Sequence, residues 1–194
     1  MFKKEIVIHS VFKEWPGEKS TLGYILFTFG TALVGTLLLI LGSYNELADL
    51  SLWQNILFSV VTFDIIGGCV ANFTESTDRY YASNNGKRWV FLAEHLVHIT
   101  LLYIATGAYL LFWLSVFIYT IGSGAAVHTI KSGKLQQLAA AILVTIGCIL
   151  FYGIYNAGTP LVQWFPALFM VKIIFGFAVR RTEYGEDQIN IKNV

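Results

Sequence analysis

Long apolar stretches separated by short polar segments occupy most of this chain. Six of them are long enough to cross the roughly 30 Å hydrocarbon layer of a bilayer as helices. They cover about residues 22–43, 52–73, 89–106, 108–128, 135–156 and 161–179. Only Thr106-Gly107 separates the third stretch from the fourth, and we expect a very tight turn there because one helix over residues 89–128 would be roughly 60 Å long. The pattern therefore predicts an all-α integral membrane protein with six transmembrane helices.

Composition supports a multi-pass protein of the cell membrane. Hydrophobic residues make up 56% of the chain and charged residues 13%, with a mean hydropathy of +0.63. A soluble domain carries about 25% charged residues. The Lys and Arg residues are dispersed and the net charge is only +1, so we expect the lipid bilayer, and no nucleic acid, as a partner.

The positive charges fall in every second connection between the apolar stretches. The N-terminal lead has four Lys, loop 74–88 has three Lys or Arg, loop 129–134 has two and the C-terminal tail has three, whereas the other connections have none. The remaining one of the 13 is Lys172, inside the sixth stretch. By the positive-inside rule, both the N- and C-termini are expected in the cytoplasm.

Two cytoplasmic segments would then flank a transmembrane domain of residues 22–179. In the lead, residues 1–21, apolar side chains recur at helical spacing: Ile8, Val11, Phe12 and Trp15. This spacing is typical of an interfacial amphipathic helix, although a flexible polar tail is also consistent with it. The tail, residues 180–194, is polar.

Five acidic, basic or histidine residues from three of the apolar stretches lie well inside them: Asp64, Glu94, His95, His98 and Lys172. At about 1.5 Å of rise per residue, all five fall roughly 8–14 Å from the cytoplasmic ends of their helices. Buried charges in lipid are costly unless they are paired or hydrated. We therefore expect them together in one cytoplasm-facing pocket. On a helical wheel the three residues of the third stretch share one face.

The chemistry of these groups indicates candidate roles. His95 or His98 could be a general acid or base, oriented by Asp64 or Glu94. Lys172 could bind an anionic head group or a developing oxyanion. The H-x-x-H spacing of His95 and His98 could also place both rings on a divalent metal. The structural alternatives are an Asp64–Lys172 ion pair that fixes packing, and a Glu94 that pairs with basic residues at the membrane surface.

Two further features lie close to these groups. Gly67-Gly68, after Asp64, would let a neighbouring helix approach closely, or would locally loosen the helix. Polar residues at the expected pocket mouth could recognise a polar head group, although a solvated helix end explains them as well: Asn72, Thr74, Thr77, Asp78, Tyr80 and Tyr81.

Three classes of function are compatible with this pattern. The first is a membrane enzyme, a hydrolase or transferase that acts on a lipid or other lipophilic small molecule at the cytoplasmic leaflet. The second is a small proton-coupled transporter or ion channel, which would need to form a homo-oligomer to build a path. The third is a structural or accessory membrane subunit. Because the charges gather in one half of the helices, and a permeation route needs polar lining on both sides, the pattern favours the enzyme.

Overall fold

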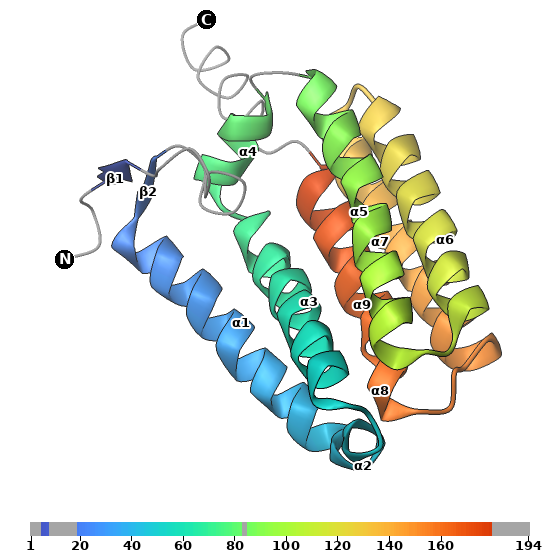
Figure 1. The fold of residues 1–194 in the computed structure, drawn as a ribbon. Helices are drawn as coiled ribbons and strands as arrows, with labels where there is room; N and C mark the ends of the chain where they lie inside the picture. The colour runs from blue at the N-terminus through green and yellow to red at the C-terminus, as the bar shows by residue number, and fades with distance from the viewer. Residues whose placement is uncertain (1–4, 8–18, 83–84, 180–194) are drawn as a thin grey trace, which may run out of the picture.

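The computed structural model describes residues 5–7, 19–82 and 85–179, and six helices in this part of the chain are long and apolar enough to cross a membrane (Figure 1). The first four contain α1 (Leu22–Gly42), α3 (Leu52–Ala71), α5 (Asn85–Thr106) and α6 (Leu110–Thr129). The fifth joins α7 (Gly133–Cys148) to the π-helical segment η2 (Ile149–Ile154). The sixth joins α8 (Pro160–Gln163), α9 (Phe165–Met170) and the π-helical segment η3 (Val171–Phe177). The prediction of six apolar helices is confirmed.

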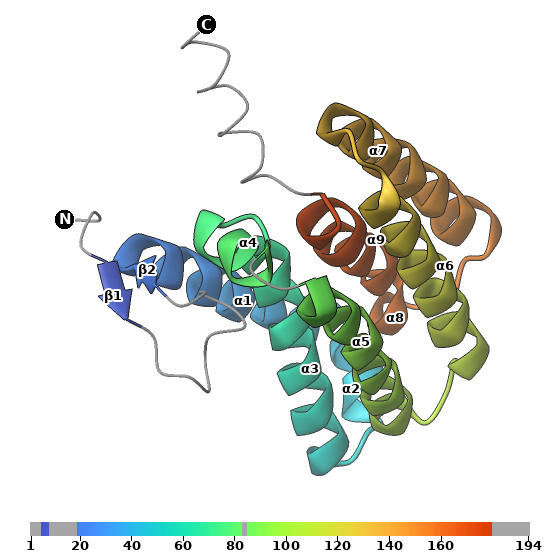
Figure 2. The same ribbon diagram turned by 90° about the horizontal axis from the view of Figure 1, so that it is seen from above.

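The sixth helix lies at the centre of the bundle. Its segments contact α3, α6 and α7, and 67% of its residues are buried, against 17% for α1 and 17% for the α7–η2 helix. Its buried side chains include Phe165, Phe169, Met170, Ile173 and Ile174. Helix α1 packs mainly against α3 at one edge of the bundle, and α7 lies at the opposite edge (Figures 1 and 2). The core is therefore built around the helix that carries Lys172.

The connection between α5 and α6 is as short as the sequence predicts. Helix α5 ends at Thr106, and Gly107 (φ 64°) and Tyr109 (φ 65°) both adopt left-handed backbone conformations before α6 begins. The Thr106 hydroxyl donates to the carbonyl of Ala108, 3.1 Å away, inside the turn. Two left-handed residues reverse the chain within three positions, because each bends the backbone against the right-handed helix.

The segment between α3 and α5 differs from the polar loop expected there. Residues Glu75–Ala82 form helix α4. The Thr74 hydroxyl accepts a hydrogen bond from the backbone N–H of Thr77 at 3.4 Å, which is the geometry of an N-cap. Glu75 and Asp78 lie in the first turn, where negative charge is favourable to the helix dipole.

A short antiparallel hairpin precedes α1. Strand β1 (Glu5–Val7) pairs with β2 (Lys19–Thr21), with Glu5 opposite Thr21. The residues of the amphipathic pattern, Ile8 to Trp15, lie outside the described residues, as does the C-terminal tail.

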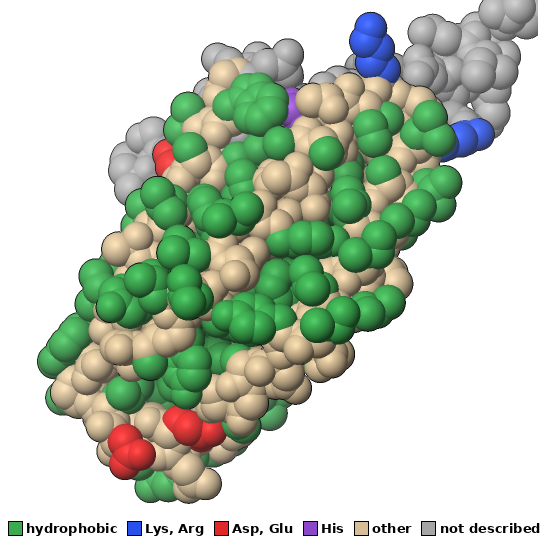
Figure 3. All heavy atoms as spheres, turned by 90° about the vertical axis from the view of Figure 1, so that its right-hand side faces the viewer, with side chains coloured by type: hydrophobic (Ala, Val, Ile, Leu, Met, Phe, Trp, Pro, Cys, Tyr) green, Lys and Arg blue, Asp and Glu red, His purple; other side chains and the backbone are tan. Residues whose placement is uncertain are grey.

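Apolar side chains cover the face of the molecule formed by α6 and α7 (Figure 3). Exposed residues of these helices and of η2 include Leu111, Ile118, Leu138, Ile149 and Ile154. On this face the Lys and Arg side chains lie at one end of the bundle, whereas Asp and Glu side chains lie toward both ends. An apolar band between two polar ends is the surface expected of a protein that lies across a bilayer.

Candidate functional site

A single carboxylate oxygen joins three helices at the candidate site. Asp64 lies in the second half of α3, and its Oδ2 atom is 2.5 Å from Nε2 of His98 on α5 and 2.9 Å from Nζ of Lys172 in η3. The Asp64 and His98 side chains are 32% and 20% exposed, whereas Lys172 is 3% exposed. A buried ammonium group requires a charged partner at hydrogen-bonding distance, and the Asp64 carboxylate supplies it.

Gly68 makes room for the lysine. A Cβ atom at this position would lie 2.3 Å from Cε and 2.7 Å from Nζ of Lys172, closer than van der Waals contact permits. The sequence expectation of a close helix approach near Gly67-Gly68 is thus confirmed at Gly68. One turn further along α3, the amide of Asn72 donates to the carbonyl of Lys172 at 3.0 Å. Together these contacts fix the side chain and the backbone of Lys172 against α3.

The two histidines of α5 lie face to face. Their ring centroids are 4.7 Å apart and the ring planes differ by 14°. His95 is 2% exposed, and its Nδ1 atom is 2.6 Å from the carbonyl oxygen of Phe91. Because a carbonyl oxygen only accepts, Nδ1 of His95 carries the hydrogen. An ionised Asp64 assigns the hydrogen of His98 to Nε2 in the same way.

Each ring therefore retains one nitrogen with a lone pair. Nε2 of His95 and Nδ1 of His98 are both buried, and neither has a hydrogen-bond partner among the described residues. His95 is further enclosed by the rings of Phe91 and Phe169, whose centroids lie 4.4 and 5.7 Å from its own. Buried polar atoms are nearly always hydrogen-bonded, so two such nitrogens on adjacent rings indicate a functional arrangement.

Glu94 does not share the buried face of its neighbour. It is exposed, like Val90 and Val97, whereas the adjacent His95 is buried. From the helical wheel, Glu94 and His95 were both expected inside one pocket. Which arc of α5 faces inward depends on packing against α3 and the sixth helix, so the spacing along the sequence could not assign it. We leave Glu94 out of the site proposed below.

The residues expected at a pocket mouth are mostly buried. Asn72, Thr74, Thr77, Asp78 and Tyr81 are buried and Tyr80 is half-buried. Tyr81 packs edge-on against the rings of Phe91 and Phe177, at centroid distances of 5.0 Å each. Thr74 caps α4, as described above. Asn72 is the member of this set that contacts the site, through the backbone of Lys172.

The described residues do not fit a divalent metal. No group of three or more His, Cys, Asp or Glu side chains in this part of the chain is arranged to hold an ion. The carboxylate nearest to the histidines already holds the Lys172 ammonium at 2.9 Å, and a dication beside it would be repelled by that positive charge. We derive no step through a metal.

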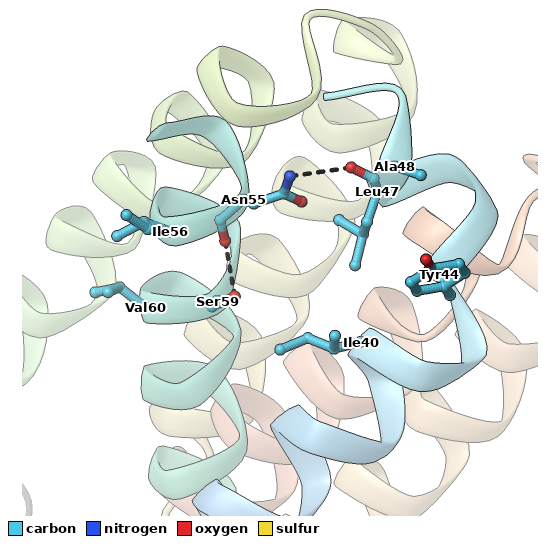
Figure 4. Close-up of a pocket in the computed structure, with 8 residues that line it drawn as sticks. All are labelled: Ile40, Tyr44, Leu47, Ala48, Asn55, Ile56, Ser59 and Val60. Atoms are coloured by element: carbon cyan, nitrogen blue, oxygen red, sulfur yellow. Dashed lines mark hydrogen bonds between the residues drawn. The ribbon is translucent and has the colours of Figure 1, made fainter. Parts of the chain in front are cut away.

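A groove at the other end of α3 was missed in the sequence analysis (Figure 4). It has a volume of about 500 Å³ and is lined by Ile40, Tyr44, Leu47, Ala48, Asn55, Ile56, Ser59 and Val60. Its amide and hydroxyl groups bond to nearby backbone: Asn55 donates to Leu47 at 3.0 Å, and Ser59 donates to Asn55 at 2.7 Å. The sequence feature that indicates this groove is the i, i+4 spacing of two polar residues, Asn55 and Ser59, within an apolar helix. Its α3 residues, Asn55 to Val60, precede Asp64 by four to nine residues, or roughly 6–14 Å along the helix, and neither Asp64 nor His98 lines the groove.

Comparison with protein-family models, with curated proteins and with solved structures gives no match. The six apolar helices suggest a multi-pass membrane protein. The inference about function therefore rests on the site itself: an aspartate that orients a histidine and is in turn held by a buried lysine.

Proposed function

We propose that this protein crosses the membrane six times with both termini in the cytoplasm. The six apolar helices, the apolar band of Figure 3 and the alternation of positive charge among the connections support this orientation. In this orientation Asp64, His98 and Lys172 lie in the cytoplasmic half of the bilayer.

We further propose that the protein is an enzyme that acts on a lipid or another lipophilic substrate, with His98 as its general base. The observation that carries this proposal is the short contact between Asp64 and Nε2 of His98. An aspartate in this position fixes the tautomer, leaves the second ring nitrogen with its lone pair, and stabilises the imidazolium formed when that nitrogen takes up a proton.

Lys172 forms the ion pair with Asp64 that was the structural alternative in the sequence analysis, and we assign it a role through that pair. It is 3% exposed and its ammonium group is bound to Asp64, so it is placed to hold the carboxylate ionised and oriented rather than to contact a head group. This makes Lys172 a positioning residue, and Gly68 and Asn72 support it.

Partial exposure of Asp64 and His98 supports a substrate that arrives from the side of the bundle, between α3 and α5. A lipid in the cytoplasmic leaflet approaches a membrane protein in this way. Nδ1 of His98 is enclosed in this conformation, so we expect neighbouring side chains to move when the substrate enters.

Purified protein in nanodiscs, incubated with fractionated membrane lipids, tests the proposal by mass spectrometry of the products. We expect turnover of one lipid class, with a loss of about 100-fold or more for His98→Gln and for Asp64→Asn. Thr100→Ala is the matched control, because Thr100 is exposed on the same helix and its hydroxyl donates to the backbone carbonyl of Leu96. Turnover that survives in His98→Gln would refute the role of His98.

The contiguous chain His98–Asp64–Lys172 supports a second candidate, a proton-coupled transporter. Titratable groups that are joined by hydrogen bonds can pass a proton from one group to the next. Acidification of protein-loaded liposomes under a membrane potential measures this directly. Proton flux that disappears in Asp64→Asn, without any lipid turnover in the wild-type protein, would favour the transporter over the enzyme.

A further inference from the structure

The strongest unexplained feature of the site is the pair of ring nitrogens that face no donor. Nε2 of His95 and Nδ1 of His98 are buried and have no hydrogen-bond partner among the described residues, and His95 is only 2% exposed. The carbonyl of Phe91 and the carboxylate of Asp64 assign the hydrogens to the opposite nitrogens of the two rings. Both remaining nitrogens are therefore acceptors.

Neither ring can satisfy the other. Two acceptors cannot bond without a hydrogen between them, and the two rings are stacked with their centroids 4.7 Å apart. One molecule that donates two hydrogens would satisfy both nitrogens. Water has two O–H groups that open at about 105°, so with hydrogen bonds of about 2.9 Å it bridges acceptors that lie roughly 4.6 Å apart. A lipid hydroxyl has only one hydrogen and would leave one nitrogen unsatisfied.

We propose that His95 and His98 together bind one water molecule and that this water is the nucleophile, so that the enzyme is a hydrolase. This inference rests on the enzyme function proposed above. With both hydrogens donated to the rings, the lone pairs of the water oxygen are directed away from the histidines, toward an incoming substrate.

The reaction follows from this placement. The water oxygen forms a bond to the electrophilic carbon or phosphorus atom of the lipid while one of its protons passes to Nδ1 of His98. The bond between that atom and the leaving group then breaks, and the leaving group takes the proton from His98. Asp64 stabilises the transient imidazolium, and His95 orients the water through its second hydrogen.

Water itself is the probe in the test. Protein with ¹⁵N-labelled histidine is reconstituted in lipid bilayers, and magnetisation transfer from water protons to each ring nitrogen is measured by solid-state NMR. We expect transfer to Nε2 of His95 and to Nδ1 of His98. The His95→Phe variant, whose ring fits among Phe91 and Phe169, should reduce the transfer at His98 to background, whereas His128→Phe, in another helix, should leave it unchanged.

Two results would overturn the inference. Nitrogens that receive no transfer, or transfer to one of them only, would show that no shared water is bound. This measurement needs no substrate, so it can succeed or fail independently of the lipid screen. If the screen does find turnover, a product formed in ¹⁸O-labelled water must contain ¹⁸O. Unlabelled product would mean that a substrate hydroxyl attacks, and would make the enzyme a transferase.

Discussion

The ion pair between Asp64 and Lys172 explains why a charged residue is tolerated at the centre of this bundle. Lys172 is 3% exposed, and removal of its partner would leave a buried charge with no counter-ion. We expect Asp64→Leu to destabilise the protein by about 3 kcal/mol, and the double variant Asp64→Leu/Lys172→Met to be clearly more stable than the sum of the single changes predicts. Denaturation in mixed detergent micelles measures all four proteins of this cycle.

These four proteins also show whether the Asp64–Lys172 ion pair serves stability or function. If single and double variants are additive, the 2.9 Å contact contributes no coupling energy. If the double variant is as stable as the wild type but has lost turnover, stability is excluded as the reason why the charges are present. Lipid turnover is therefore measured on the same samples.

The close approach of Lys172 to Gly68 can be tested by adding a single methyl group. Gly68→Ala should lower stability by about 1–3 kcal/mol, because the new Cβ atom would lie 2.3 Å from Cε of Lys172 and would displace the lysine from Asp64. Gly30→Ala in α1 is the matched control. No atom lies within 4 Å of a Cβ there, so this change should be neutral or slightly stabilising. Equal thermal shifts for the two variants would contradict the close approach at Gly68.

Single residues of the site could be predicted only in part. The fixed rise of a helix placed Asp64, His98 and Lys172 at one depth, and the structure brings these three together. The same reasoning included Glu94, which is exposed, because rotation about the helix axis is set by neighbouring helices. The H-x-x-H spacing predicted that His95 and His98 are neighbours on one helix face, but not that their rings stack. The stacking depends on χ angles that are fixed by the surrounding aromatic rings.

At the scale of elements, the left-handed backbone of the α5–α6 turn can be tested by comparing Gly107 with a glycine inside a helix. Gly107 has φ 64° and open space around its Cβ position, and Gly122 in α6 has the same open space without a positive φ. Gly107→Ala should therefore cost about 1 kcal/mol through backbone strain alone, while Gly122→Ala should gain up to about 1 kcal/mol. Thermal unfolding in detergent compares them. A stabilising Gly107→Ala would mean that the turn has another conformation.

Elements with a hydropathy signal were predictable, and those selected by tertiary contacts were not. The six apolar helices and the turn at Thr106-Gly107 follow from length and from the absence of polar breaks. The π-helical segment η3 has no such signal, since its extra residue per turn is stabilised by partners in other helices, including the Asn72 amide on the Lys172 carbonyl. Helix α4 was missed because its residues are polar, although Thr74 is a recognisable cap.

At the scale of the whole molecule, the position of the sixth helix connects fold to function. Helices α3, α6 and α7 surround it, and its Lys172 is fixed at the point where it meets α3. Helices α1 and α7 are largely exposed and lie at the two edges of the bundle. A substrate that enters between α3 and α5 would therefore reach His98 without any separation of the central helix from its neighbours.

The proposed orientation in the membrane can be tested by labelling two exposed connections. Asp49, beyond α2, and Lys131, between α6 and α7, are both exposed and lie in connections that the charge pattern assigns to opposite sides of the membrane. In a background with Cys69→Ala and Cys148→Ala, Asp49→Cys should react with a membrane-impermeant maleimide added to intact cells. Lys131→Cys should react only after permeabilisation. The reverse labelling would place His98 in the outer half of the bilayer, and the substrate would then have to be sought among lipids of the outer leaflet, because helix direction alone determines which leaflet meets the site.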